Sequence, residues 1–175
     1  MLEKKITAEE FETYLQEFVG RNLAEFYYIT DTTVVFESGE RYLDHEITTS
    51  KGGKKPIYRY EFELWIGGNW QYKKDGQVME TTEVKFNEDG PKYRSRIGDF
   101  IETIHPSKIT AIKVSEDGKE TTIILDSGGQ FVVTPRGDSY ISYTNRTFDN
   151  DGRIVETRHV RPNENTGELV HIQAP

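Results

Sequence analysis

Four Asp-Gly pairs divide this chain and constrain its fold more than any other feature. They are Asp75-Gly76, Asp89-Gly90, Asp117-Gly118 and Asp151-Gly152, and each lies between segments that alternate apolar and polar residues. Asp-Gly tolerates positive φ and therefore favours the tight turns that join antiparallel strands. The sequence therefore predicts an antiparallel β-meander over residues 57–161.

The composition also favours strands over helices. Val, Ile and Thr together number 44, against 7 Leu and 4 Ala. β-Branched side chains suit a pleated, half-buried surface, whereas Leu and Ala favour helices. The composition does not change along the 175 residues, so we expect a single domain that covers residues 1–175.

One segment, residues 7–26, has a helical pattern. Thr7 and Glu10 have the spacing of a capping box, which satisfies free backbone N–H groups at the start of a helix. Apolar residues then recur at helical spacing along one side. These residues are Phe11, Leu15, Phe18, Val19, Leu23 and Phe26. We therefore predict one N-terminal helix that covers a sheet.

The remaining segments predict strands and turns. Two strands, 26–30 and 32–37, are expected to follow the helix, and part of the polar stretch 38–55 is expected to be a loop. A polar C-terminal tail, 162–175, is expected to contain a short strand at 169–172. The meander between them is expected to contain roughly ten strands, at 57–66, 69–74, 77–86, 92–97, 100–104, 109–115, 120–125, 130–134, 139–148 and 153–161.

This order of elements predicts a mainly β (α+β) fold, with an N-terminal helix followed by an antiparallel β-meander. We expect a lipocalin-like barrel, because closure leaves no strand edge open to other chains. The alternative is an α+β fold in which the helix packs across a strongly curved sheet. Both architectures leave a cavity or a concave face for a ligand.

Basic residues at strand spacing are the candidates for binding an anion. Lys92, Arg94 and Arg96 would share one face of a strand, and His159 and Arg161 would share a face of the strand 153–161. A guanidinium group pairs with a carboxylate or phosphate through two hydrogen bonds. The alternative is that these residues face water and pair with Glu and Asp of neighbouring strands. We select Arg94, Arg96, His159 and Arg161 as ligand-binding residues.

Aromatic residues are the candidates for an apolar wall in the same site. Tyr58 and Tyr60 lie on one face of the strand 57–66, and Trp70 follows the Gly67-Gly68 turn. Aromatic side chains that line a cavity suit a flat or amphipathic ligand. The alternative is that Tyr58 and Tyr60 belong to the core. Trp65 faces the opposite way along the strand and could contact a ligand or a partner.

No motif in the chain predicts catalysis or a bound cofactor. There is no Gly-x-Ser-x-Gly nucleophile motif and no cysteine. None of His45, His105, His159 and His171 has metal-ligand spacing to another histidine. Asp99 and His105 are a conceivable acid–base pair, although we expect His105 to lie in a turn. We therefore select no catalytic residue, no metal ligand and no cofactor.

The sequence favours a non-enzymatic β-barrel module that binds a small anionic or aromatic molecule. One alternative is an acidic interaction or inhibitor protein that masks a basic surface of a partner, because the net charge is −8. Another is a lyase or isomerase that acts in the barrel cavity. The acidic surface disfavours nucleic acids, and no run of about 18 apolar residues predicts a membrane span. We expect a cytoplasmic protein whose exposed edge strands could pair two copies into a homodimer.

Overall fold

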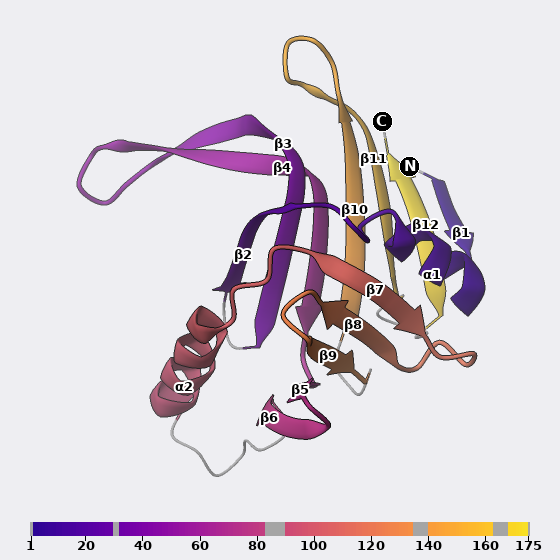
Figure 1. Cartoon of the computed structure of the whole chain (residues 1–175). Coiled ribbons are helices and arrows are strands. Elements are labelled where there is room, and N and C mark those ends of the chain that lie inside the picture. Colours follow the sequence, from indigo (N-terminus) through magenta and orange to yellow (C-terminus); the bar gives the residue numbers. More distant parts are fainter. Residues whose placement is uncertain (1, 30–31, 83–89, 135–139, 163–167, 175) are drawn as a thin grey trace.

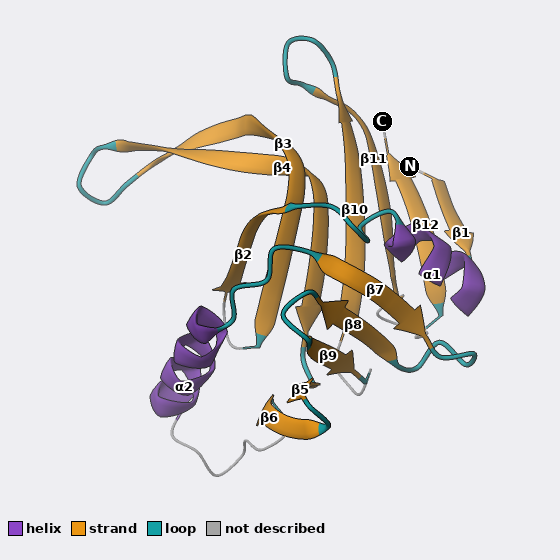
Figure 2. Cartoon of the chain, viewed as in Figure 1, coloured by secondary structure: helices purple, strands orange, loops and turns teal. Residues whose placement is uncertain are grey.

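The computed structural model describes residues 2–29, 32–82, 90–134, 140–162 and 168–174. Strands dominate it, and every strand pair is antiparallel (Figure 2). The elements in chain order are β1 (Leu2–Lys5), α1 (Ala8–Gln16), β2 (Leu23–Ile29), β3 (Thr33–Thr48), β4 (Lys54–Gly67), β5 (Trp70–Lys74), β6 (Gln77–Thr81), α2 (Gly90–Thr103), β7 (Ile109–Val114), β8 (Thr121–Leu125), β9 (Gly129–Val133), β10 (Tyr140–Phe148), β11 (Ile154–Pro162) and β12 (Leu169–Ala174). The predicted mainly β fold with antiparallel sheets is therefore confirmed.

The strands form two sheets (Figure 1). The large sheet has seven strands in the order β1-β12-β11-β10-β4-β3-β2, and the small sheet has five in the order β6-β5-β9-β8-β7. Between the described residues, one isolated bridge, Asn22 with Lys108, connects the start of β2 to the start of β7. No strand pairing in this part of the chain closes either sheet, so the predicted lipocalin-like barrel is not confirmed.

The chain passes from the large sheet to the small sheet at Gly67 and Gly68. The pairing of β4 with β10 ends at Gly67 and Tyr140, and the pairing of β5 with β9 begins at Trp70 and Val133. A Cβ atom on Gly67 would lie 2.5 Å from the ring of Tyr140, and Gly68 has a φ of 78°. Both positions therefore favour glycine, because one is crowded and the other has a positive φ.

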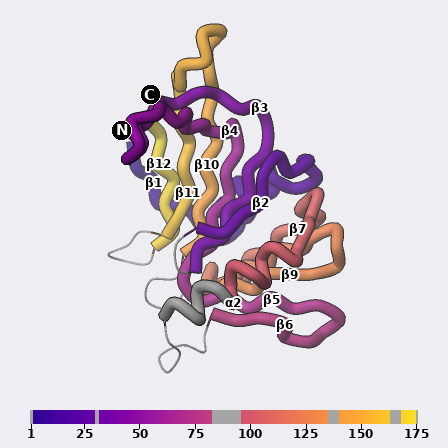
Figure 3. Tube along the Cα trace, turned by 90° about the vertical axis from the view of Figure 1, so that its left-hand side faces the viewer, coloured from indigo at the N-terminus to yellow at the C-terminus, as the bar shows by residue number. Residues whose placement is uncertain are grey.

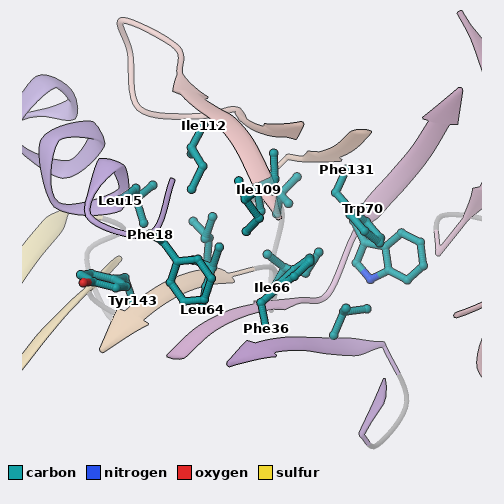
Figure 4. Packing of buried hydrophobic residues seen from close by; sticks show 14 of the residues in the cluster. Leu15, Phe18, Phe36, Leu64, Ile66, Trp70, Ile109, Ile112, Phe131 and Tyr143 are labelled. Carbon is teal, nitrogen blue, oxygen red and sulfur yellow. The ribbon is translucent and has the colours of Figure 1, made fainter. Parts of the chain in front are cut away.

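A packed apolar core fills the space between the large sheet, the small sheet and helix α1 (Figure 4). The large sheet contributes alternate residues to it, as period-2 strands require. We call the side of the large sheet that carries them the first face, and the opposite side the second face. The first-face core residues are Val34, Phe36, Phe62, Leu64, Ile66, Ile141, Tyr143 and Val160. Figure 3 shows the small sheet to one side of the large sheet.

The N-terminal helix begins as predicted and ends earlier. Thr7 and Glu10 form the expected capping box, with a distance of 3.1 Å from Glu10 N to Thr7 Oγ1 and 2.8 Å from Thr7 N to Glu10 Oε2. The prediction of a helix over 7–26 was wrong beyond Gln16, because turns follow and Gly20 has a φ of 81°. Phe18 continues the apolar pattern because the turn also delivers its side chain to the core.

Part of 38–55 was predicted to be a loop, and the loop is confined to residues 49–53, between β3 and β4. Here β3 and β4 continue as a long hairpin, and β10 and β11 form a second one, so that both project beyond the small sheet (Figure 1). We call residues 39–60 the β3–β4 arm and residues 146–156 the β10–β11 arm. Solvent reaches both faces of the β3–β4 arm, so its strands lack the apolar alternation that identifies half-buried strands.

The predictions of strands at 92–97 and 100–104 were also wrong, because residues 92–97 and 100–103 lie in helix α2 and Ile104 follows it. Ile97, Ile101 and Ile104 are buried at helical spacing, although β-branched residues favour strands. Lys92, Arg94 and Arg96 consequently do not share the face of a strand. Neither α2 nor α1, the helices in the described ranges, is long and apolar enough to cross a membrane.

Three of the four Asp-Gly pairs are confirmed as turns between strands. They are Asp75-Gly76 between β5 and β6, Asp117-Gly118 between β7 and β8, and Asp151-Gly152 between β10 and β11. Asp75 has a φ of 50° and Gly76 a φ of 75°, as a two-residue hairpin turn requires. Asp89 lies outside the described residues, and Gly90 begins α2, so the fourth pair does not join two strands.

We expect Gly67→Ala to lower the free energy of unfolding by about 2 kcal/mol, because the added methyl group would meet the Tyr140 ring. Urea denaturation measures the change. The matched control is Gly53→Ala, where the added methyl group would make only an ordinary contact with Thr49. If both variants have the same stability, the sheet crossing at Gly67 is not sterically constrained.

Candidate functional site

A row of polar side chains crosses the second face of the large sheet. Strand pairing places Glu37 of β3 beside Glu63 of β4, Glu63 beside Thr144 of β10, and Thr144 beside His159 of β11. We call these four residues the polar row. Their strand neighbours Phe36, Leu64, Tyr143 and Val160 are first-face core residues. Alternation therefore directs the polar row away from the core.

A buried ion pair stands at the centre of the polar row. Arg146 Nη1 lies 2.7 Å from Glu63 Oε1, and Arg146 Nη2 donates a hydrogen bond of 3.0 Å to Glu63 Oε2. The two side chains are only 12% and 3% exposed. Trp65 Nε1 also donates to Glu63 Oε2, at 3.3 Å. A charge buried this deeply is costly unless its counter-ion remains in place.

Glu37 is buried beside this pair without a guanidinium partner of its own. Tyr27 Oη donates a hydrogen bond of 2.8 Å to Glu37 Oε1. Burial raises the pKa of Glu37 to about 7, and the negative charges of Glu63 and Glu25 add to the rise. The hydrogen bond from Tyr27 and the charge of Arg146 oppose it. Glu37 can therefore gain or lose a proton near neutral pH.

His159 lies at the other end of the polar row. Its Nδ1 atom is 2.8 Å from Thr144 Oγ1. Burial lowers the pKa of His159 to about 4, and the charges of Arg161 and Arg146 lower it further. The imidazole is therefore uncharged at neutral pH. Shifted pKa values that gather in one place are typical of functional sites and of structural ion-pair networks.

A second feature is a surface hollow of about 280 Å³ between the β3–β4 arm and the β10–β11 arm. Its lining residues are Tyr42, Leu43, Asp44, Arg59, Phe148, Gly152, Arg153 and Ile154. The rings of Tyr42 and Phe148 stack, with their centroids 3.6 Å apart and their planes inclined by 16°. The arms therefore meet through an aromatic contact at this hollow.

The charged groups of the hollow are only partly paired. Asp44 Oδ2 accepts a hydrogen bond of 3.1 Å from Arg59 Nε and lies 2.9 Å from His45 Nδ1. Burial raises the pKa of Asp44, but the hydrogen bonds from His45 and Arg59 outweigh it and leave this pKa below its usual value. The exposed guanidinium of Arg153 has no acidic partner within the described ranges. The hollow thus offers positive charge beside stacked rings.

The structure brings together two of the predicted anion-binding residues. His159 and Arg161 both lie on β11, and the charge of Arg161 acts on the imidazole. Arg96 lies in α2 and pairs with Glu80 of β6. Arg94 also lies in α2, but its side chain is outside the described part of the structure. The two pairs of basic residues therefore lie on different elements.

The predicted aromatic residues also lie apart. Tyr58 is on the β3–β4 arm, where the Arg41 guanidinium lies 4.1 Å from its ring centroid. Tyr60 is buried, and its hydroxyl donates to Glu25 Oε1 at 3.4 Å. Trp70 is a core residue, only 1% exposed. The seven predicted ligand-binding residues thus do not form one site, and their role in ligand binding stays a prediction.

Several residues of the polar row and the hollow were not selected from the sequence, because the patterns that point to them are weak. Alternation along the strand 57–66 places Glu63 opposite the apolar face, but burial of its side chain depends on β10. Glu37 follows the apolar run Val34–Phe36, which is a signal of a buried strand end. Arg153 and Phe148 could not be linked to Tyr42, because part of the stretch around Tyr42 was expected to be a loop and no pairing was predicted for it. In the part of the chain that the structure describes, no three acidic or histidine side chains are grouped to hold a metal ion.

We expect Arg146→Met to lower the free energy of unfolding by about 3 kcal/mol, because Glu63 would remain buried without its counter-ion. The double variant Arg146→Met/Glu63→Leu should lose less than the single variant, because both charges are gone. Chemical denaturation at neutral pH measures both changes. Arg153→Met, at an exposed arginine, is the control and should stay within about 0.5 kcal/mol of the wild type. A double variant less stable than Arg146→Met would contradict this account.

Searches of protein families, of curated proteins and of solved structures found no match to this chain.

Proposed function

We propose that this chain is a non-enzymatic protein that binds a small anionic molecule with a flat apolar part. Its ligand lies in the hollow between the β3–β4 arm and the β10–β11 arm. The observation that carries this proposal is the combination of stacked Tyr42 and Phe148 rings with the guanidinium groups of Arg59 and Arg153 around one hollow. We select no catalytic residue for this function.

The chemistry of the hollow supports this ligand class. A guanidinium group recognises a carboxylate or phosphate through paired hydrogen bonds, and an aromatic face supports a flat ring. Arg153 supplies the positive charge that Asp44 does not engage, since Asp44 bonds to Arg59. A volume of about 280 Å³ is at the lower end for small-molecule sites, so the ligand is a small metabolite.

The proposed site differs from the one expected inside a barrel. A lipocalin-like barrel would hold its ligand between the two sheets, where Trp70, Phe131 and the other core residues now pack. The hollow lies outside this core and needs no closed barrel. The proposed ligand class is the one inferred from the sequence, but the proposed binding site lies between the arms and not inside a barrel.

A second candidate is an interaction protein whose arms contact a partner. Large apolar side chains are exposed on both arms, and such side chains often mark contact surfaces. They are Leu43, Ile47, Tyr58, Ile154 and Val155. With a net charge of −8, the partner would be a basic protein surface or, at the sheet edges, a second copy of the chain. A cytoplasmic location is proposed for either function from the lack of cysteine.

Binding of simple probes tests the ligand proposal. We expect benzoate and phenyl phosphate to shift the backbone amide resonances of Gly152 and Ile154 in NMR titrations. Benzyl alcohol lacks the charge and acetate lacks the ring, so both should bind at least about tenfold more weakly. Arg153→Ala should weaken the binding of benzoate by a similar factor.

Lys119→Ala is the control, because this exposed lysine lies in the turn between β7 and β8, away from the hollow. It should bind benzoate as the wild type does. Native mass spectrometry of protein purified from its own host then shows the natural ligand as an adduct that denaturation removes. Equal shifts with all four probes, or none with any probe, would overturn the proposal. A co-purified polypeptide would favour the interaction function.

A further inference from the structure

We propose that Glu37 and Glu63 form a carboxyl pair that holds one proton at neutral pH, and that loss of this proton weakens the β2–β3 edge of the large sheet. The proposal goes beyond ligand binding in the hollow and does not depend on it. The proton-binding site lies on the second face, at the β3 end of the polar row.

The two carboxyl groups are forced close together by strand register. Glu37 and Glu63 are direct partners across β3 and β4, and such partners have Cβ atoms about 5 Å apart. Both residues are buried, with exposed fractions of 6% and 2%. Two charged carboxylates on such buried neighbours repel each other, because little water is present to screen them.

The positive charge of Arg146 neutralises only one of the two carboxylates. The Arg146 guanidinium contacts both oxygens of Glu63, at 2.7 and 3.0 Å. Trp65 adds a hydrogen bond to the same carboxylate. From the described side chains, Glu37 receives only the hydroxyl hydrogen of Tyr27. Glu63 is therefore the charged member of the pair, and Glu37 is the member that carries the proton.

One oxygen of Glu63 has room for a further hydrogen bond. Glu63 Oε1 is buried and accepts no hydrogen bond from the described residues, because its contact with Arg146 Nη1 is an ion pair without hydrogen-bond geometry. A neutral carboxyl group can donate one hydrogen bond, whereas a carboxylate can only accept. The proton on Glu37 can therefore supply the donor that Glu63 lacks.

The other charged groups around Glu37 do not remove the need for a proton. From β2, the carboxylate of Glu25 adds negative charge, and burial keeps Tyr27 neutral by raising its pKa. From β4, Arg59 is engaged by Asp44 in the hollow. From β11, Arg161 lies beside His159, farther along the row. The immediate surroundings of Glu37 are thus net negative.

Glu37 is the group of the polar row that changes charge near neutral pH. Its pKa is about 7 in the folded chain, above the usual value of 4.5. His159 has a pKa of about 4 and stays neutral over the same range. A carboxyl group whose pKa is raised by folding stabilises the folded state fully below its unfolded pKa. That stability is lost as the pH rises through about 7.

The effect of losing the proton is greatest at the edge of the large sheet. Strand β2 is the edge strand, and the Tyr27 hydroxyl joins it to Glu37 on β3. Glu25 is the direct partner of Glu37 on β2. A charged Glu37 therefore repels Glu25 on one side and Glu63 on the other, and β2 has no further strand to hold it among the described residues.

Chemical denaturation across the range from about pH 5 to 8 tests the proposal. The equilibrium constant for unfolding of the wild type should rise by a factor on the order of tens over this range. The variant Glu37→Gln keeps the shape of the side chain but cannot ionise, so it should lose most of this increase. It should be more stable than the wild type at the alkaline end and similar at the acidic end.

Two measurements separate Glu37 from other titrating groups. Glu120→Gln removes an exposed carboxylate just before β8 of the small sheet and should retain most of the wild-type pH dependence. Carbon-13 NMR of the side-chain carboxyl groups should show Glu37 titrating near pH 7. Hydrogen-exchange protection factors of the β2 amides, which remove the intrinsic rise of exchange with pH, should also fall in the wild type above this pH.

The wild-type titration decides the question even if Glu37→Gln does not fold. A Glu37 carboxyl that titrates below about pH 5 would overturn the proposal. A Glu37→Gln variant that keeps the full pH dependence of the wild type would also overturn it, since groups other than Glu37 would then account for the change. Titration of the Glu37 carboxyl group near neutral pH, together with lower protection factors of the β2 amides above that pH, supports the proposal.

Discussion

In-register pairing of β3, β4, β10 and β11 is the constraint on which both faces of the large sheet depend. It sends Phe36, Leu64 and Tyr143 into the core and, one residue along each strand, Glu37 and Glu63 onto the second face. A slip of one residue in any of these strands would exchange the two sets and bury carboxylates in an apolar core. The core already favours this register, and the ion pair of Arg146 with Glu63 stabilises the same register.

The hollow and the polar row differ in how rigidly they are held. The polar row lies where the large sheet is widest, so each of its residues has a paired strand on both sides. The hollow lies farther out, where both faces of the arms are exposed and the Tyr42–Phe148 contact joins them. A site on the arms can adjust to a ligand, whereas the polar row can respond to a proton without moving its backbone.

The sequence was sufficient where a local rule acts alone. The capping box of α1, three Asp-Gly turns and the alternation in β4 all depend on neighbours in the chain, and the structure confirms them. Helix α2 was missed because its core residues, Ile97, Ile101 and Ile104, are β-branched, and tertiary packing decided their conformation. The length of the β3–β4 arm was missed because its exposed strands carry no apolar alternation, whereas both strands of the β10–β11 arm were predicted. The Arg146–Glu63 pair joins residues that are 83 positions apart, so no short segment of sequence could show it.

Among the described strands, β1 pairs only with β12, which places Lys5 opposite Val170, a residue far away in the sequence. The ribosome adds β1 long before β12, so β1 must wait for its partner while the strands between them are made. Helix α1 can form meanwhile from its own capping box, whereas β1 stays unpaired and exposed. Contacts of such long sequence separation slow folding, so completion of this sheet edge is expected to be a late event in biogenesis.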